Sequence, residues 1–379
     1  MKKKTILIAN DGRLLKKSFL GFLILMTAFQ TNALGELVRQ VLIDAYLQVS
    51  VFVGFTLFIF IGLDSLTKFN IAYILEKTKK FHVVMASLLG AIPGCGGAIV
   101  VVTQYIQGRI SFGSLVAVLT ATMGDAAFLL LAAEPQTGLL VFVIAGIVGI
   151  LTGYIVDFFH GQSYLQGDSK IKVEFQKLKK TFVSRFNIFW SLIFLPGFFI
   201  GLLVASQIDP DKLFNIPKDY SLVSFLGLSG AILSIFMWSL NPLSDFQCSA
   251  DRTRNLLPRV VDTTNFVTTW VICGFLVFEL FMYFTTIDLK ILFNIWLPLV
   301  PLVAILLGFL PGCGPQIIVT TFYLNGYIPL SAEIGNAISN DGDALFPAIA
   351  LAPKAAIIAT LYSAIPAIII AYSFMFIFE

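Results

Sequence analysis

Residues 89–96, Leu-Gly-Ala-Ile-Pro-Gly-Cys-Gly, return at residues 307–314 as Leu-Gly-Phe-Leu-Pro-Gly-Cys-Gly. The likeness continues into a second motif, Gly-Asp-Ala-x-Phe, at residues 124–128 and 342–346. Every matched position is offset by 218 residues without a gap, and 18 of the 47 positions in 89–135 are identical to those in 307–353. The chain is therefore an internal duplication, and each copy places a Pro-Gly break and an aspartate within apolar sequence.

The composition is that of a polytopic, all-α membrane protein. Of the 379 residues, 58% are hydrophobic and only 12% are charged, which is more apolar surface than a soluble domain can cover. The four cysteines are scattered and form no CxxC motif, so they predict no disulfide framework. The two histidines flank apolar runs, which excludes a histidine metal site deep in the membrane.

Apolar runs predict nine membrane-crossing helices, each long enough for a hydrocarbon core of about 30 Å. Their expected ranges are 18–34, 46–66, 111–133, 137–159, 187–208, 222–240, 263–285, 329–351 and 355–377. Two further segments, 82–107 and 291–323, contain the Pro-Gly-Cys-Gly motifs. They either cross the membrane or enter it and return.

The distribution of Lys and Arg decides between these paths, because basic residues accumulate on the cytoplasmic side. If both segments crossed, the 25 basic residues would divide 14 inside and 11 outside. If both are re-entrant hairpins, 21 lie inside and only Arg39, Lys212, Lys218 and Lys290 lie outside. We therefore expect hairpins, whose arms of about 15 Å would each span half a bilayer.

With hairpins, five crossings separate equivalent positions, so the two copies are inverted relative to each other. The predicted organisation is a first transmembrane repeat (18–159), a basic cytoplasmic linker with a linking helix (160–221) and a second repeat (222–379). The basic, then apolar N-terminus also fits a cleaved signal. A retained first helix with a cytoplasmic N-terminus is favoured, because the second copy has a helix at the corresponding place.

Three aspartates lie near the middle of predicted helices: Asp125, Asp341 and Asp343. An unpaired carboxylate at mid-bilayer costs at least ~2.5–3.5 kcal/mol, so such residues normally face a cavity, a partner or an ion. No Lys or Arg lies inside any predicted helix, which argues against an ion pair. We expect a bound cation, either the substrate or a coupling ion.

Two asparagines extend this site. Asn336, Asn340 and Asp343 are spaced i, i+4, i+7, which in one continuous helix would place them on one face. Oxygen ligands of this kind suit hard or borderline divalent cations such as Mn²⁺, Mg²⁺ or Ca²⁺. The first copy has fewer polar residues here, so the site is expected to be unequal.

The Pro-Gly-Cys-Gly breaks have two interpretations. An unwound turn frees backbone carbonyls for an ion, and a cysteine thiolate would favour a softer transition metal. Alternatively, a tight hairpin needs Pro and Gly, and Cys95 and Cys313 are small buried fillers. The remaining residues of the two breaks are Pro93, Gly94, Gly96, Pro311, Gly312 and Gly314.

Several polar residues on the second hairpin arms are weaker candidates. Thr103, Gln104 and Thr321 could line an ion path or serve helix packing, and Gln316 follows the second break at depth. Three glutamates are expected to be solvated or packed and are left out of the site: Glu134, Glu279 and Glu333.

Taken together, the duplicated motifs resemble those of the bacterial family of manganese exporters, also described as ten-span heavy-metal exporters. The resemblance covers nearly the whole chain apart from the linking helix. It implies a secondary transporter that exports Mn²⁺ across the inner membrane, with Mn²⁺ as substrate, no other cofactor and no nucleic-acid partner. The positions that carry over are Cys95, Asp125, Cys313, Asp341 and Asp343.

Other functions remain open at this stage. An arsenical or other soft-metal permease would use Cys95 and Cys313. An intramembrane enzyme would use Asp125 and Asp343 as an acid–base pair, but the sequence offers no nucleophile–base set and so favours a protein that is not an enzyme. The chain has no Walker motif, so its energy source is expected to be an ion gradient, with protons as a candidate coupling ion.

Overall fold

The computed structural model describes residues 2–66, 81–92, 96–124, 126–161, 163–165, 185–206, 208–217, 220–241, 256–285, 297–312 and 314–379. All regular secondary structure in these segments is helical, which confirms the all-α class. The chain forms two compact units, and each unit combines helices from both sequence copies. The predicted repeat boundaries therefore mark sequence copies rather than compact units, and they stay a prediction.

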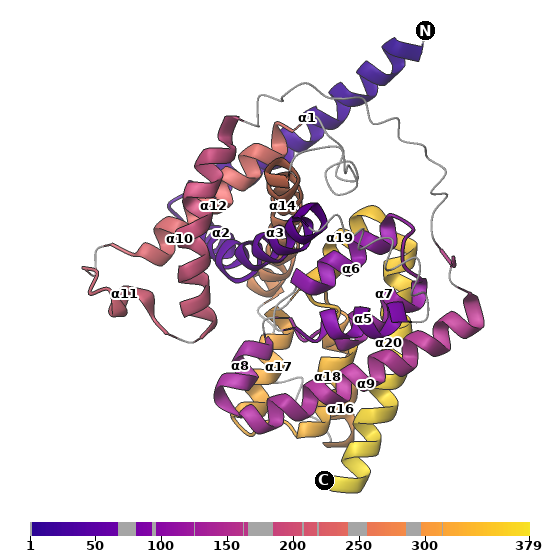
Figure 1. Cartoon of the computed structure of the whole chain (residues 1–379). Helices are drawn as coiled ribbons and strands as arrows, with labels where there is room; N and C mark the ends of the chain where they lie inside the picture. The colour runs from indigo at the N-terminus through magenta and orange to yellow at the C-terminus, as the bar shows by residue number, and fades with distance from the viewer. Residues whose placement is uncertain are drawn as a thin grey trace. The chain divides into compact units, whose positions relative to one another are not determined.

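Unit 1 comprises Met1–Ile61, Val173–Val204 and Ile208–Leu280. Its α-helices, labelled in Figure 1, are α1 (Lys2–Ala28), α2 (Ala33–Asp44), α3 (Val51–Leu66), α10 (Asn187–Ala205), α11 (Pro210–Leu213), α12 (Leu222–Ser239) and α14 (Leu256–Thr285). The π-helical turn η1 (Ala45–Ser50) joins α2 to α3. At the offset of 218 residues, α12 corresponds to α1, and α14 corresponds to the run α2–η1–α3.

Glycines allow the helices of unit 1 to pack closely around Tyr46. A Cβ atom at Gly230 would lie 2.1 Å from Cζ of Tyr46, and one at Gly197 would lie 3.2 Å from its Cε1. Small residues allow this approach between helices in lipid, where the surrounding tails are as apolar as the side chains. Trp190 Nε1 also donates a hydrogen bond to Asn265 Oδ1 over 2.9 Å, which ties α10 to α14.

Unit 2 comprises Gly62–Lys172, Ala205–Gln207 and Phe281–Glu379. From the first copy it takes α5 (His82–Gly90), α6 (Gly96–Ile106), α7 (Phe112–Ala121), α8 (Ala126–Ala133) and α9 (Pro135–His160). From the second copy it takes η4 (Leu297–Leu299), α16 (Val300–Gly308), α17 (Gly314–Leu324), α18 (Leu330–Ser339), η5 (Gly342–Ala344), α19 (Leu345–Leu351) and α20 (Pro353–Phe378). Both ends of α5, α6, α7 and α9 recur 218 residues later, in α16, α17, α18 and α20.

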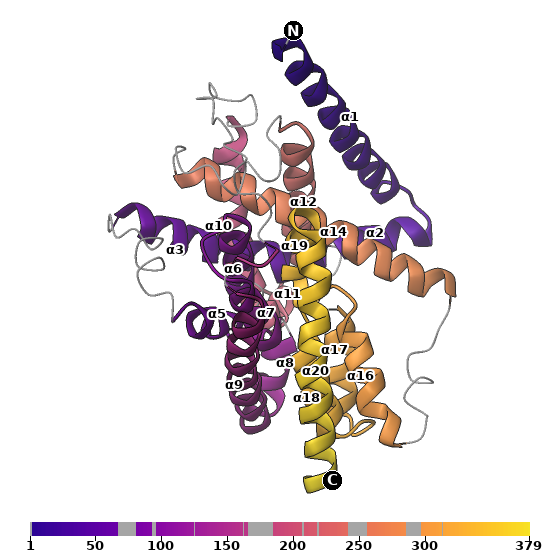
Figure 2. The same cartoon turned by 90° about the vertical axis from the view of Figure 1, so that its right-hand side faces the viewer.

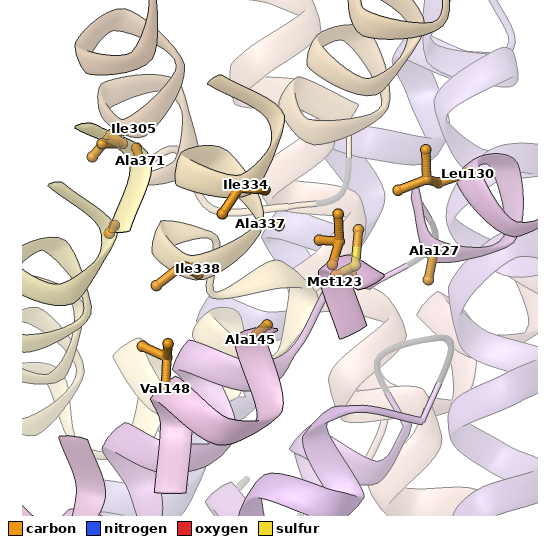
Figure 3. Packing of buried hydrophobic residues seen from close by; sticks show 12 residues of the cluster. Met123, Ala127, Leu130, Ala145, Val148, Ile305, Ile334, Ala337, Ile338 and Ala371 are labelled. Carbon is orange, nitrogen blue, oxygen red and sulfur yellow. The ribbon is translucent and has the colours of Figure 1, made fainter. Parts of the chain in front are cut away.

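The two copies pack reciprocally within unit 2. α7 contacts α20 and α9 contacts α18; α6 contacts α19 and α8 contacts α17. Figure 2 shows α9 and α20 side by side. Figure 3 shows part of the apolar core between the copies, which includes Val148 from α9, Ile338 from α18 and Ala371 from α20. The duplication is therefore a structural pairing as well as a sequence repeat.

Both Pro-Gly-Cys-Gly motifs interrupt helices, as the sequence predicts. α5 ends at Gly90 before α6 begins, and α16 ends at Gly308 before α17 begins. α5 and α6 contact each other, and a Cβ atom at Gly97 would lie 2.1 Å from the carbonyl oxygen of Leu89. With 9 and 11 residues, the two arms are about 14 and 17 Å long, too short for either to cross a bilayer alone.

Six helices in the described part of the chain are long and apolar enough to cross a membrane, and the bent pair α7–α8 makes up to seven. They are Ala33–Ile59, Pro135–His160, Asn187–Ala205, Leu222–Ser239, Leu256–Thr285 and Pro353–Phe378. The protein is therefore a multi-pass membrane protein.

Several predicted helix limits are wrong. The first helix starts at Lys2 rather than at 18, and the second starts at Ala33, where the Asn32 side chain accepts a hydrogen bond from the Gly35 amide over 3.0 Å. The helix predicted from 263 begins at Leu256. Apolar runs mark where lipid surrounds a helix, and a helix can continue past that point into polar sequence.

Candidate metal site

The predicted helices 111–133 and 329–351 are both broken in the middle. α7 ends at Ala121 and α18 at Ser339, and the residues that follow, Thr122 and Asn340, are extended with ψ of 130° and 125°. Gly124 and Gly342 then have φ of +53° and +56°. Only glycine adopts this left-handed conformation without cost, so the glycine of the Gly-Asp-Ala-x-Phe motif makes the break possible.

This break overturns the expected helical face. Asn336 belongs to α18, whereas Asn340 and Asp343 lie in the unwound segment and in η5, so the spacing i, i+4, i+7 does not align them on one helix. The sequence prediction failed because the segment is apolar on both sides of the motif and resembles one continuous span. What the break provides instead is a short stretch of irregular backbone beside two carboxyl groups.

Asn340 joins this break to the hairpin of the same copy. Its Nδ2 donates to Oε1 of Gln316, at the start of α17, over 2.5 Å. Its Oδ1 accepts from the amide of Gly342 over 3.2 Å. In addition, α6 of the first copy contacts η5. Elements of both copies and the second Pro-Gly-Cys-Gly hairpin therefore meet at residues 340–344.

The two aspartates of the second copy are buried at this point. Asp341 is 1% exposed and Asp343 is fully buried. Thr360 on α20 donates a hydrogen bond to Oδ2 of Asp341, while Oδ1 of Asp341 has no hydrogen-bond partner among the residues that the structure describes. The sequence places no Lys or Arg on α6, α16, α17, α18, η5 or α19. A buried carboxyl oxygen without a donor or a cation is costly, and it is available as a ligand.

Asn336 lies one turn before the break and connects two helices. Its Nδ2 donates to the carbonyl of Ala304 on α16 over 2.7 Å, and Oδ1 is without a described partner. Ser339 donates to the carbonyl of Ile305 over 3.1 Å. These bonds hold the end of α18 against the first arm of the hairpin and so fix where the unwound segment begins.

The first copy is less polar at the same positions. Met123 replaces Asp341 and lies in the apolar core, close to Ala127 and Leu130 (Figure 3). Ala98 replaces Gln316 and is fully buried. The predicted inequality of the two copies is therefore seen in the described residues.

Five predicted site residues, Pro93, Gly94, Cys95, Asp125 and Cys313, lie outside the described residues. Within the described part of the chain, no three His, Cys, Asp or Glu side chains lie close enough together to hold a metal ion.

The candidate path residues divide into two groups. Thr103 and Thr321 donate to carbonyls of their own helices, Ile99 and Ile317, over 2.8 and 2.7 Å, which favours helix packing. Gln104 accepts from Arg109 over 2.9 Å at the end of α6. By contrast, Gln316 faces the break. Three glycines and a proline shape the hairpins: Gly96, Pro311, Gly312, which has a φ of +114°, and Gly314.

Sequence reasoning missed Glu333, which is fully buried on α18. Thr320 on α17 donates to its Oε1 over 2.8 Å. The available signal was a carboxylate among the apolar residues of a membrane segment, the same signal that identified the aspartates. Its position four residues into the predicted helix suggested the interface instead.

Among known protein families, the one described as "Putative, 10TM heavy-metal exporter" matches residues 33–378 of this chain. None of the curated proteins and none of the solved structures matches the chain. The matched range includes both hairpins, both broken helices and every predicted site residue. The chain therefore belongs to this family of heavy-metal exporters.

Proposed function

We propose that this protein exports Mn²⁺ from the cytoplasm through a site at the broken helices of unit 2. The observation that carries the proposal is the unwound segment 340–343, in which Asp341 and Asp343 are buried and Oδ1 of Asp341 has no hydrogen-bond partner among the described residues. Asn340 adds an amide oxygen, and Asp125 is the equivalent of Asp343 in the first copy. An ion that enters this segment would neutralise carboxyls that are otherwise costly to bury.

The proposed metal follows from the ligand types. Carboxylate and amide oxygens suit Mn²⁺ and other hard or borderline divalent cations, whereas thiolates suit softer ones. The Pro-Gly breaks would supply backbone carbonyls to such a site, and Cys95 and Cys313 would add sulfur ligands in a softer one. The soft-metal permease is therefore the alternative that a metal measurement has to distinguish.

The proposed arrangement is a pair of inverted repeats in a bacterial inner membrane, with the N-terminus in the cytoplasm. One contact supports the inversion. His160 Nε2, at the end of α9, is hydrogen-bonded to the hydroxyl of Tyr362, in the first half of α20, over 3.1 Å. Contact between the end of one helix and the first half of its equivalent favours antiparallel packing, which inverted repeats require.

The test is the metal content of cells that lack the protein or express variants. We expect deletion to raise total Mn, and wild type and the control Glu279→Gln to lower it again. Asp341→Asn and Asp343→Asn should fail to lower it. Glu279 is a partly buried carboxyl on α14 in unit 1, so its amide controls for the loss of a membrane carboxyl elsewhere.

Mass spectrometry of Mn, Fe, Zn and As in the same cells separates the alternatives. If the cellular content of Zn or As depends on the protein and that of Mn does not, the manganese assignment is wrong. Loss of that Zn or As export in Cys95→Ser or Cys313→Ser would favour the soft-metal permease. If no element moves while the protein is present in the membrane, export itself is refuted.

A further inference from the structure

α17 carries a polar face that the metal site does not account for. Gln316, Thr320 and Tyr323 are spaced i, i+4, i+7 within one unbroken helix, so they lie on one side over about 10 Å. Each has a partner on another element: Asn340 donates to Gln316, Thr320 donates to Glu333 over 2.8 Å, and Tyr323 donates to Glu134 over 2.9 Å. We call these six residues the α17 lane.

Glu333 is the deeply buried carboxyl of the lane. Its Oε1 accepts from Thr320, and its Oε2 has no hydrogen-bond partner among the described residues although the residue is fully buried. A carboxyl in this position either remains charged at high cost or holds a proton.

Among the described helices packed against α18, no Lys or Arg lies close to Glu333. The helices packed against α18 are α7, α9, α16, α17 and α20, and the only Lys or Arg on any of them is Lys354. The far end of α20 is held at the start of α18, where Glu379 accepts from the Ser331 amide over 2.9 Å. Lys354 is exposed and lies 25 residues before Glu379, about 37 Å along α20.

The other end of the lane reaches a partly exposed carboxyl. Glu134 lies between α8 and α9, next to the exposed residues Ala133 and Pro135. It accepts hydrogen bonds from Tyr323 and from Thr137, over 2.9 and 2.8 Å. Tyr323 also interacts electrostatically with Glu333, so the phenol is coupled to both the partly exposed and the buried carboxyl. Apart from Tyr323 and Glu134, a further titratable side chain lies at the start of α18. It is Glu379, which accepts a hydrogen bond from the Ser331 hydroxyl.

The first copy shows that this fold does not need the lane. At the equivalent positions, Ala98, Val102 and Leu115 replace Gln316, Thr320 and Glu333, and all three are buried. The equivalent helices α6 and α7 keep the same ends and the same mutual contact. Tyr105 keeps the tyrosine at the position of Tyr323, so Gln316, Thr320 and Glu333 are the polar groups confined to the second of these helix pairs, and packing does not explain them.

We propose that Glu333 is the proton-binding site that couples transport, loaded from the Glu134 end of the lane. A proton from water first binds Glu134. The Tyr323 hydroxyl then turns to give its own proton to Glu333 and takes the Glu134 proton in exchange, which leaves Glu333 neutral and Glu134 ionised again. The reverse steps restore the Glu333 carboxylate as a strong acceptor for Thr320. On the same face of α17, Thr320 bonds to Glu333 and Gln316 bonds to Asn340. A change in the protonation state of Glu333 is therefore transmitted along α17 to the segment that would hold the metal. Coupling to metal rests on the proposed function, whereas proton binding does not.

The test uses the full chain in proteoliposomes, with Mn²⁺ as probe, and compares Glu333→Gln with Glu279→Gln. We expect Glu333→Gln to lose proton-driven Mn²⁺ accumulation while it retains Mn²⁺/Mn²⁺ exchange at zero proton gradient, because a permanently neutral side chain still permits the metal cycle. Glu279→Gln should retain both activities. Tyr323→Phe, which removes the bridging hydroxyl but preserves the ring, should slow proton-driven transport and leave exchange intact.

Two results would overturn the proposal. If Glu333→Gln keeps proton-driven transport with an unchanged pH profile, Glu333 carries no coupling proton. If it loses exchange as well while remaining a folded monodisperse protein, the residue belongs to the metal site instead.

An infrared titration of the purified protein separates this proposal from the proposed function. The carbonyl stretch of a protonated carboxyl should be present in wild type and Glu279→Gln and reduced in Glu333→Gln, whether or not Mn²⁺ is transported. If the wild type shows the band but moves no Mn²⁺, the metal assignment fails alone. If the band is unchanged in Glu333→Gln, proton binding at Glu333 is refuted.

Discussion

Thr268 Oγ1 donates a hydrogen bond to Ser50 Oγ over 2.8 Å, and these two residues are 218 positions apart, the spacing of the duplication. A second residue also contacts its own equivalent: a Cβ atom at Gly21 would lie 3.1 Å from Cβ of Ser239, which is its equivalent in the second copy. In a two-fold arrangement, a residue can touch its own equivalent only close to the axis. Both contacts lie in unit 1, and they support the proposed two-fold relation between the copies within this unit.

This contact predicts a specific crosslink. In the double variant Ser50→Cys with Thr268→Cys, two thiols replace two hydroxyls that are already in contact, so an oxidant should form a disulfide without backbone movement. The control pair is Ser50→Cys with Thr269→Cys, because the Thr269 hydroxyl donates to Asn265 of its own helix over 2.9 Å. Peptide mass spectrometry before and after reduction should detect the bridge in the first pair only. An equal yield in both pairs would contradict the close register of α14 against η1.

Gly342→Ala should destabilise unit 2 and disturb the metal site. The φ of +56° is a left-handed conformation that costs a side-chain-bearing residue about 1–2 kcal/mol, and the two aspartates flank it. The matched control is Gly146→Ala in the middle of α9, where a Cβ atom would meet nothing within 4 Å and alanine favours the helix. Thermal unfolding in detergent should show a lower midpoint for Gly342→Ala and an unchanged or higher one for Gly146→Ala. Equal midpoints would mean that the break tolerates a regular backbone.

How far the sequence predicts this structure depends on the kind of signal. The duplication predicts that equivalent helices end at equivalent positions, because the same turn residues recur 218 positions later. Gly108 and Gly326, with φ of +70° and +73°, are one such pair. The break around Gly342 was not predictable from hydropathy, since the extended Asn340 and the left-handed Gly342 that form it lie within a segment that is apolar on both sides. For Glu333 the sequence left open whether the side chain is solvated or packed, because its depth depends on how α18 packs against α17, which composition does not encode. The aspartates were singled out because a carboxylate within apolar sequence is evident from the sequence itself, and their role in a metal site stays a prediction.

Gly230→Ala should destabilise unit 1. The added methyl would lie 2.1 Å from Cζ of Tyr46, whose ring is buried between α10, α12 and η1, so either the ring or a helix has to move. Overpacking of this kind typically costs about 1–3 kcal/mol. The second-site change Tyr46→Leu should restore part of the loss, because it removes the atoms that clash. Unfolding midpoints of the single and double variants test this, and a double variant less stable than both single variants would contradict the contact.

Thr360→Val should weaken metal binding without removing transport. The Thr360 hydroxyl donates to Oδ2 of Asp341, and this bond orients the carboxylate whose other oxygen is available to an ion. A hydrogen bond to a charged group contributes about 1.5–3 kcal/mol, so the Mn²⁺ concentration for half-maximal transport should rise by roughly ten-fold or more, with little change in the maximal rate. Thr360→Ser keeps the hydroxyl and should restore binding. Thr321→Val is the matched control, since that hydroxyl donates to the carbonyl of Ile317 in its own helix. If both valine variants shift the Mn²⁺ dependence equally, the effect comes from general packing, and Asp341 does not require Thr360 for its orientation.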